Sequence, residues 1–107
     1  MNRKTIIAVD FDGTLCKDDW PGIGEPNRVL IEILKRLKEG DRIKLILWTC
    51  RSDSMLDEAV KWCGEQGLIF DAVNDNLPEY IELFGNNSRK VFADIYIDDK
   101  GFNVEGF

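Results

Sequence analysis

The sequence predicts an α/β protein, built on a parallel sheet of about four strands and forming a single domain over residues 1–107. Short, continuous apolar runs alternate with longer segments whose apolar residues recur at helical spacing. Hydrophobic residues make up 44% of the 107 residues, which is enough for one core. The order β-α-β-α-β-α-β implies right-handed crossovers, with helices covering both faces of the sheet.

The first strand is the run 6–9, and it leads directly into Asp10-Phe11-Asp12-Gly13-Thr14. Ligands of parallel sheets bind beyond the carboxyl ends of the strands, and residues i and i+2 of a strand project to the same side. Two carboxylates this close repel unless a cation or a proton intervenes, and hard oxygen ligands suit Mg²⁺. The alternative interpretation is a polar exit from strand to turn.

Residues 15–26 are expected to form a loop or small flap after the acidic pair, in which Trp20 either shields the site or packs on the body. A helix then runs from Pro26 to a stop at Gly40. Its expected apolar face consists of Val29, Leu30, Ile33, Leu34 and Leu37.

The second strand is 43–48 and ends at Thr49. A capping box at 54–57 is expected to begin the second helix, which Gly67 ends. A weaker strand at 68–73 and a short helix at 78–84, stopped by Gly85, follow. The last strand, 93–97, ends in Asp98 and Asp99, and the tail to Phe107 shows no pattern. The polar strand ends should therefore meet at one edge of the sheet.

Composition excludes several function classes. The net charge of −6 disfavours non-specific binding to nucleic acid or to anionic membranes. The absence of histidine excludes Ser-His-Asp and Cys-His catalysis. Three cysteines without CxxC spacing, and no signal or membrane-spanning segment, predict reduced thiols and a cytoplasmic location.

Four motifs together resemble the haloacid dehalogenase (HAD) superfamily of Mg²⁺-dependent phosphohydrolases, over nearly the whole chain. Residues 10–15 match its D-x-D-G-T-L signature. Thr49 matches the Thr or Ser that ends the next strand, and Lys90 the Lys before the last acidic strand. The pair Asp98-Asp99 after an apolar strand matches the fourth motif.

The resemblance implies a three-layer, Rossmann-like fold with strand order 3-2-1-4. It also implies a phosphomonoester hydrolase in which Asp10 is the nucleophile that becomes an aspartyl-phosphate. Asp12 would be the general acid and then the base, Thr49 would bind the phosphoryl oxygens, and Lys90 would neutralise charge. Mg²⁺ would be held by Asp10, the Asp12 backbone carbonyl and the acidic pair.

Some assignments within this set stay open. Arg89 is an alternative to Lys90, and Asp99 an alternative to Asp98 as the direct ligand. We also place Gly13, Cys50 and Arg51 at the substrate, although Arg51 is as well explained as a surface residue. The stretches between the motifs leave no room for a cap domain, which favours large substrates or a homo-oligomer.

Three rival interpretations remain. A receiver domain places its acceptor Asp after the third strand, where this chain has Val73-Asn74. A catalytically silent protein of the same fold would keep the motifs for binding or regulation. A nucleotide or polynucleotide phosphatase would keep the same kind of reaction but act on a different substrate. In the main hypothesis we expect the substrate to be a small phosphorylated molecule.

Overall fold

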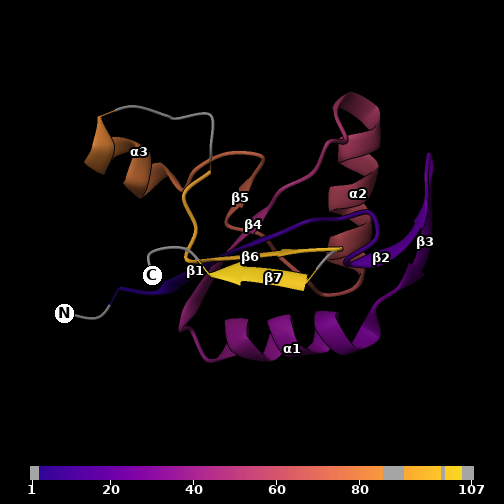
Figure 1. Cartoon of the computed structure of the whole chain (residues 1–107), viewed down its shortest axis with the longest axis horizontal. Coiled ribbons are helices and arrows are strands. Elements are labelled where there is room, and N and C mark those ends of the chain that lie inside the picture. Colours follow the sequence, from indigo (N-terminus) through magenta and orange to yellow (C-terminus); the bar gives the residue numbers. More distant parts are fainter. Residues whose placement is uncertain (1–2, 86–90, 100, 105–107) are drawn as a thin grey trace.

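The computed structural model describes residues 3–85, 91–99 and 101–104, and its centre is a five-stranded sheet (Figure 1). The strand order is β5-β4-β1-β6-β7. The parallel strands are β5 (Ala72–Val73), β4 (Ile43–Leu47), β1 (Thr5–Val9) and β6 (Ile95–Asp98). In chain order these are the third, second, first and fourth, so the expected order of the parallel sheet is confirmed.

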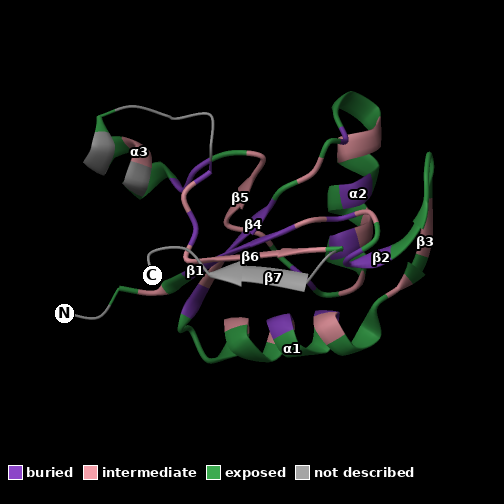
Figure 2. Ribbon diagram, in the orientation of Figure 1, coloured by how far each residue is buried: buried purple, intermediate pink, exposed green. Residues whose placement is uncertain are grey.

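The two faces of the sheet carry separate apolar clusters, as the alternation of side chains along a strand requires. One face presents Ile7, Val9, Leu45 and Leu47, and it is covered by α1 (Arg28–Glu39) and α2 (Asp53–Glu65). The other presents Ile6, Ala8 and Ile46. It is covered by Leu77, which precedes α3 (Pro78–Phe84), and by Val91 and Ala93. Figure 2 shows the buried centre along β1 and β4.

Helix α1 begins two residues later than Pro26 suggested, because Asn27 caps it by accepting a hydrogen bond from Leu30 N at 3.2 Å. The expected apolar face of this helix is partly wrong. Ile31 and Leu34 are buried, whereas Val29, Ile33 and Leu37 are exposed at 73%, 50% and 40%. The inward face of the helix is thus rotated toward Ile31, a residue that the helical spacing did not single out.

Helix α2 does not use the expected capping box. It begins at Asp53, with Ser52 at the N-cap position and without a hydrogen bond from the side chain of Ser52. The third strand is also shorter than expected. Asp71 lies just before β5, and its carboxylate accepts a hydrogen bond from Leu45 N at 2.8 Å, taking the place of a backbone partner.

Three strands lie where none was expected. The predicted loop is a hairpin of β2 (Cys16–Asp19) and β3 (Gly22–Pro26), which stands beside α2 in Figure 1. A Cβ atom at Gly24 would lie 2.2 Å from the carbonyl oxygen of Lys17, so the hairpin needs glycine there. The tail forms β7 (Gly101–Val104), which is antiparallel to β6.

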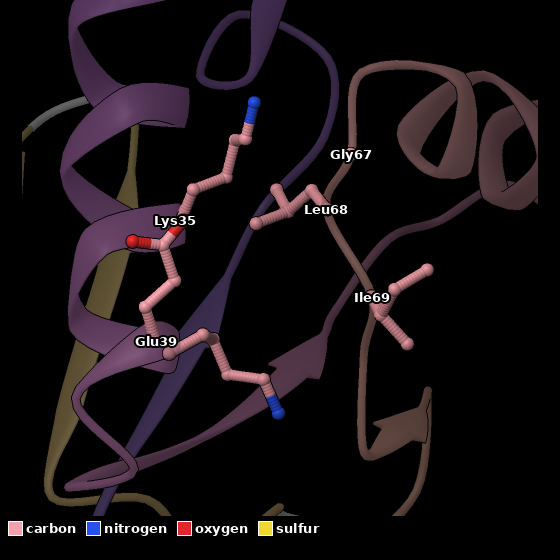
Figure 3. A pocket seen from close by; sticks show the side chains of 6 residues that line it. Lys35, Glu39, Gly67, Leu68 and Ile69 are labelled. Atoms are coloured by element: carbon pink, nitrogen blue, oxygen red, sulfur yellow. The ribbon is translucent and has the colours of Figure 1, made fainter.

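Within the described part of the chain, none of the helices has the length and apolar character needed to span a bilayer. A cavity of about 230 Å³ lies between α1 and the segment that follows α2, with Leu68 pointing toward α1 (Figure 3). None of the predicted site residues lines this cavity.

Candidate active site

Hydrogen bonds between neighbouring strands bring the predicted site residues to one edge of the sheet. Asp10 N donates to Ile97 O, and Trp48 N donates to Val9 O, each at 2.9 Å. The residues that directly follow β1, β4 and β6 are therefore held side by side. The expectation that the polar strand ends share one edge is confirmed for the described residues.

A tight turn, not a continued strand, places Asp12 beside Asp10. Strand β1 ends at Val9, and the amides of Thr14 and Leu15 both donate to Phe11 O, at 3.2 and 3.0 Å. Phe11 is fully buried, with its ring edge-on to Trp62 at a centroid distance of 5.5 Å. The anchored Phe11 therefore leaves its two acidic neighbours half-buried at the edge of the sheet.

Gly13 allows this turn to approach the acidic pair Asp98-Asp99, the fourth predicted motif. Its φ of +80° is unfavourable for other residues, and a Cβ atom there would lie 3.2 Å from Asp99 Cβ. Glycine at this position therefore brings the loop after β1 against the loop after β6. The contact is to Asp99, so the structure places Gly13 against the acidic pair.

The electrostatics of Asp10 show that the acidic residues lie close enough to interact. Burial raises the pKa of Asp10 above its ordinary value, and the charges of Asp99, Asp12 and Asp98 raise it further. A hydrogen bond of 2.8 Å from Phe11 N to Asp10 Oδ1 acts in the opposite direction. An ionised Asp10 thus lies in a field that a cation would relieve.

Arg51 is the cation that this edge already contains. Its side chain is fully buried and forms a two-pronged ion pair with Asp12: Nε donates to Oδ2 at 2.9 Å and Nη2 to Oδ1 at 2.8 Å. The hydrogen bond to Asp12 is the main reason that the pKa of Arg51 is raised. The interpretation of Arg51 as a surface residue is wrong, because Asp12 and the hairpin enclose it.

Thr49 and Asn74 fix the loop that carries Arg51. Thr49 Oγ1 accepts a hydrogen bond from Arg51 N at 3.1 Å, and Thr49 N donates to Asn74 Oδ1 at 2.7 Å. Asn74 follows β5 in a left-handed conformation with φ of +51°. In the sequence, Asn74 stands out only as a residue at the end of the third apolar run. Its position at the end of the third strand was the available signal.

The remaining predicted residues are Cys50, Trp20 and Lys90 with its alternative Arg89. Cys50 is exposed beside Thr49. Trp20 is 54% exposed at the hairpin tip, with the Arg51 guanidinium 5.0 Å from the centroid of its ring. Lys90 and its alternative Arg89 lie outside the described residues.

The donor chemistry at this edge fits a hard divalent cation. Carboxylates predominate, and the charges of Asp99, Asp12 and Asp98 add to burial in raising the pKa of Asp10. Among the residues that the structure describes, however, no three acidic or thiol side chains already converge as a cation site. Both carboxylate oxygens of Asp12 are also paired with Arg51, which favours the backbone carbonyl of Asp12 over its side chain as a metal ligand.

Fold and site together define an α/β protein with an acidic cluster at the carboxyl edge of its parallel strands. The chain is similar to a solved structure described as that of a conserved protein coded by a locus from Bacteroides thetaiotaomicron, with 44% identity and a TM-score of 0.79. The match covers 98% of this chain and 82% of the Bacteroides chain, so this protein belongs to the same family. No protein-family model and no curated protein matches the sequence.

Proposed function

We propose that the protein is a phosphomonoester hydrolase of the HAD type that depends on Mg²⁺ and lacks a cap domain. The observation that carries the proposal is the position of Asp10. This half-buried carboxylate directly follows the central strand, lies close to Asp12 and the acidic pair at the end of β6, and shares its sheet edge with Thr49. Phosphoryl transfer requires mainly a positioned nucleophile and neutralised charge, and this edge supplies the groups for both.

The reaction would divide into two steps on this chain's own residues. Asp10 attacks the phosphorus atom of the ester to form an aspartyl-phosphate, while Asp12 gives a proton to the departing oxygen. Asp12 then takes a proton from the water that hydrolyses the aspartyl-phosphate. Thr49 would donate its hydroxyl hydrogen to a phosphoryl oxygen, because the backbone amide of Arg51 occupies only an acceptor site of that hydroxyl.

Charge neutralisation would be shared between a metal and a lysine. Asp10, the backbone carbonyl of Asp12 and Asp98, with Asp99 as the alternative, would hold Mg²⁺. Bound there, Mg²⁺ would stabilise the negative charge of the transferring phosphoryl group. Lys90 keeps its expected role of neutralising the phosphate and Asp10.

The proposal is tested by the turnover of an aryl phosphate, with and without Mg²⁺, by the wild type and by Asp10→Asn. We expect metal-dependent turnover that the substitution reduces to background, because an amide cannot act as the nucleophile. The matched control is Asp57→Asn, which removes an exposed carboxylate on α2 and should leave turnover unchanged. Retained activity in Asp10→Asn would contradict the nucleophile assignment.

One observation favours a second candidate, a catalytically silent protein of this fold. Arg51 holds both carboxylate oxygens of Asp12, the residue that must exchange protons with substrate and water. A wild type that turns over neither aryl phosphates nor a panel of nucleotides, sugar phosphates and phosphopeptides would favour this candidate. Binding of Mg²⁺ measured by calorimetry would then show whether the acidic edge is still a metal site.

A further inference from the structure

Arg51 is bound more completely than an arginine that serves only as a counterion. A buried guanidinium is costly unless its hydrogen-bond donors are satisfied. Four hydrogen bonds leave this group, and its side chain is 0% exposed. Two of the bonds go to Asp12. The other two go to backbone carbonyls of the hairpin, Pro21 O at 3.2 Å and Gly22 O at 2.7 Å.

Aromatic rings enclose the same guanidinium. The Arg51 Cζ atom lies 5.1 Å from the ring centroid of Phe11 and 5.0 Å from that of Trp20. Phe11 belongs to the turn after β1, and Trp20 to the tip of the hairpin. Arg51 therefore contacts two segments that flank Asp12, and it reaches both from the loop after β4.

We propose that Arg51 is a positioning residue that fixes the Asp12 carboxylate beside Asp10 and fastens the tip of the β2–β3 hairpin next to it. The catalytic half of this inference rests on the function proposed above. Arginine suits the role because its planar fork binds both carboxylate oxygens and still has donors left for the hairpin carbonyls. Lysine offers three donors from one nitrogen and cannot reproduce the fork.

The ion pair is compatible with proton transfer by Asp12. A carboxylate has about four lone-pair sites, and the fork of Arg51 uses one on each oxygen. The remaining sites can take a proton or accept a hydrogen bond from water. Arg51 thus fixes the direction in which Asp12 offers its free sites without occupying them all.

The catalytic test compares two leaving groups, because proton donation matters most for a poor one. p-Nitrophenyl phosphate releases a phenolate that needs no proton, whereas an alkyl phosphate releases an alkoxide that does. kcat/KM reports formation of the aspartyl-phosphate and is measured with Mg²⁺ for the wild type, Arg51→Met and Arg51→Lys. The control is Arg36→Met, which removes an exposed arginine on α1.

We expect Arg51→Met to lose at least about tenfold more kcat/KM on the alkyl than on the aryl ester, with Arg51→Lys between it and the wild type. Equal losses on the two esters would overturn the catalytic half while leaving the phosphatase proposal intact. A wild type that is inactive on both esters would contradict the phosphatase itself, and the catalytic half with it.

The second half of the inference is tested without activity, by hydrogen exchange of the backbone amides in residues 16–26. We expect faster exchange there in Arg51→Met, with unchanged exchange in β4 and in the Arg36→Met control. Arg51→Lys keeps the charge and serves as the second variant if Arg51→Met fails to fold. Wild-type exchange rates in the hairpin of a folded Arg51 variant would overturn the fastening role.

Discussion

At the scale of single residues, a buried guanidinium changes the electrostatics expected for the acidic edge. The sequence places four carboxylates there and offers Lys90 as the cation. The structure adds Arg51, which is paired with Asp12. Among the neighbouring charges, that of Asp99 raises the pKa of Asp10 most. A bound cation would therefore act most strongly between Asp10 and Asp99.

Asp71 carries the clearest pH-dependent contribution to stability. Burial acts to raise its pKa, but hydrogen bonds from Lys38 Nζ and Leu45 N, together with the charge of Lys44, outweigh burial and lower the pKa. A lowered pKa in the folded state stabilises the fold above the ordinary value of 3.8, and the stabilisation is lost as the pH falls through the lowered pKa.

We therefore expect Asp71→Asn to lower the free energy of unfolding by about 1–2 kcal/mol at pH 7 and by less at pH 3. Urea denaturation at the two pH values measures both differences. Asp57→Asn, at an exposed position of α2, is the control and should cost little at either pH. An Asp71→Asn penalty that does not shrink in acid would show that the lost interactions do not depend on charge.

Residue positions were predictable where a strand end decides them. Asp10 and Thr49 come after the buried strands β1 and β4, and Asp98 is the last residue of β6. Parallel pairing brings such strand ends together. The ion pair of Arg51 with Asp12 was not predictable, because it joins residues 39 positions apart through a loop and a hairpin. The role of Asn74 was not predictable for the same reason, since its partners Thr49 and Arg51 lie in the loop after β4.

At the scale of elements, the helical spacing of apolar residues correctly predicted α1, but it included exposed residues in the expected apolar face. Leu34 is buried in the cluster between the helix and the sheet, whereas its neighbour Ile33 is 50% exposed. Leu34→Ala should lower the free energy of unfolding by about 3 kcal/mol, because it removes buried methyl groups and leaves a cavity. Ile33→Ala should cost less than about 1 kcal/mol.

Chemical denaturation of the two variants checks this difference, and the pair is matched because both substitutions shorten an aliphatic side chain on the same helix. A large loss from Ile33→Ala would show that the exposed side of α1 is covered in solution. The free energy of unfolding of Ile33→Ala would then be measured again at several protein concentrations, since burial against a second copy makes stability concentration-dependent.

The hairpin β2–β3 was missed because its sequence lacks the alternation that marks a half-buried strand. Cys16 is buried, but the three residues after it in β2 are all exposed. The hairpin instead depends on the close approach at Gly24 and on the contacts of its tip with Arg51. The short helix α3, by contrast, was predictable from its ends, since Pro78 starts it and Gly85 stops it with φ of +72°.

At the scale of the whole molecule, the apolar clusters and the acidic edge are separate. The clusters lie on the two faces of the sheet, and the acidic residues follow the ends of its strands. Stability should therefore come from the faces, whereas at the edge burial and the repulsion between carboxylates raise the pKa of Asp10 and disfavour its ionised form. The parallel sheet was predictable from its buried apolar runs, whereas its strand order was predicted only through the resemblance to the HAD superfamily. The antiparallel β7 was not predictable, because the tail shows no apolar pattern.

This separation predicts how the fold responds to Mg²⁺. A chelator should leave the protein folded, because the described apolar clusters do not involve the acidic edge. Added Mg²⁺ should raise the Tm of the wild type in proportion to the logarithm of its concentration above Kd, since it binds only the folded state.

Asp10→Asn should raise the Tm in chelator, because it removes a repelling charge, and should reduce the further gain from Mg²⁺. Differential scanning calorimetry of both proteins, in EDTA and in a Mg²⁺ series, measures all four values. Unfolding of the wild type by EDTA would mean that the metal is structural, and the acidic edge would then have to be part of what holds the sheet together.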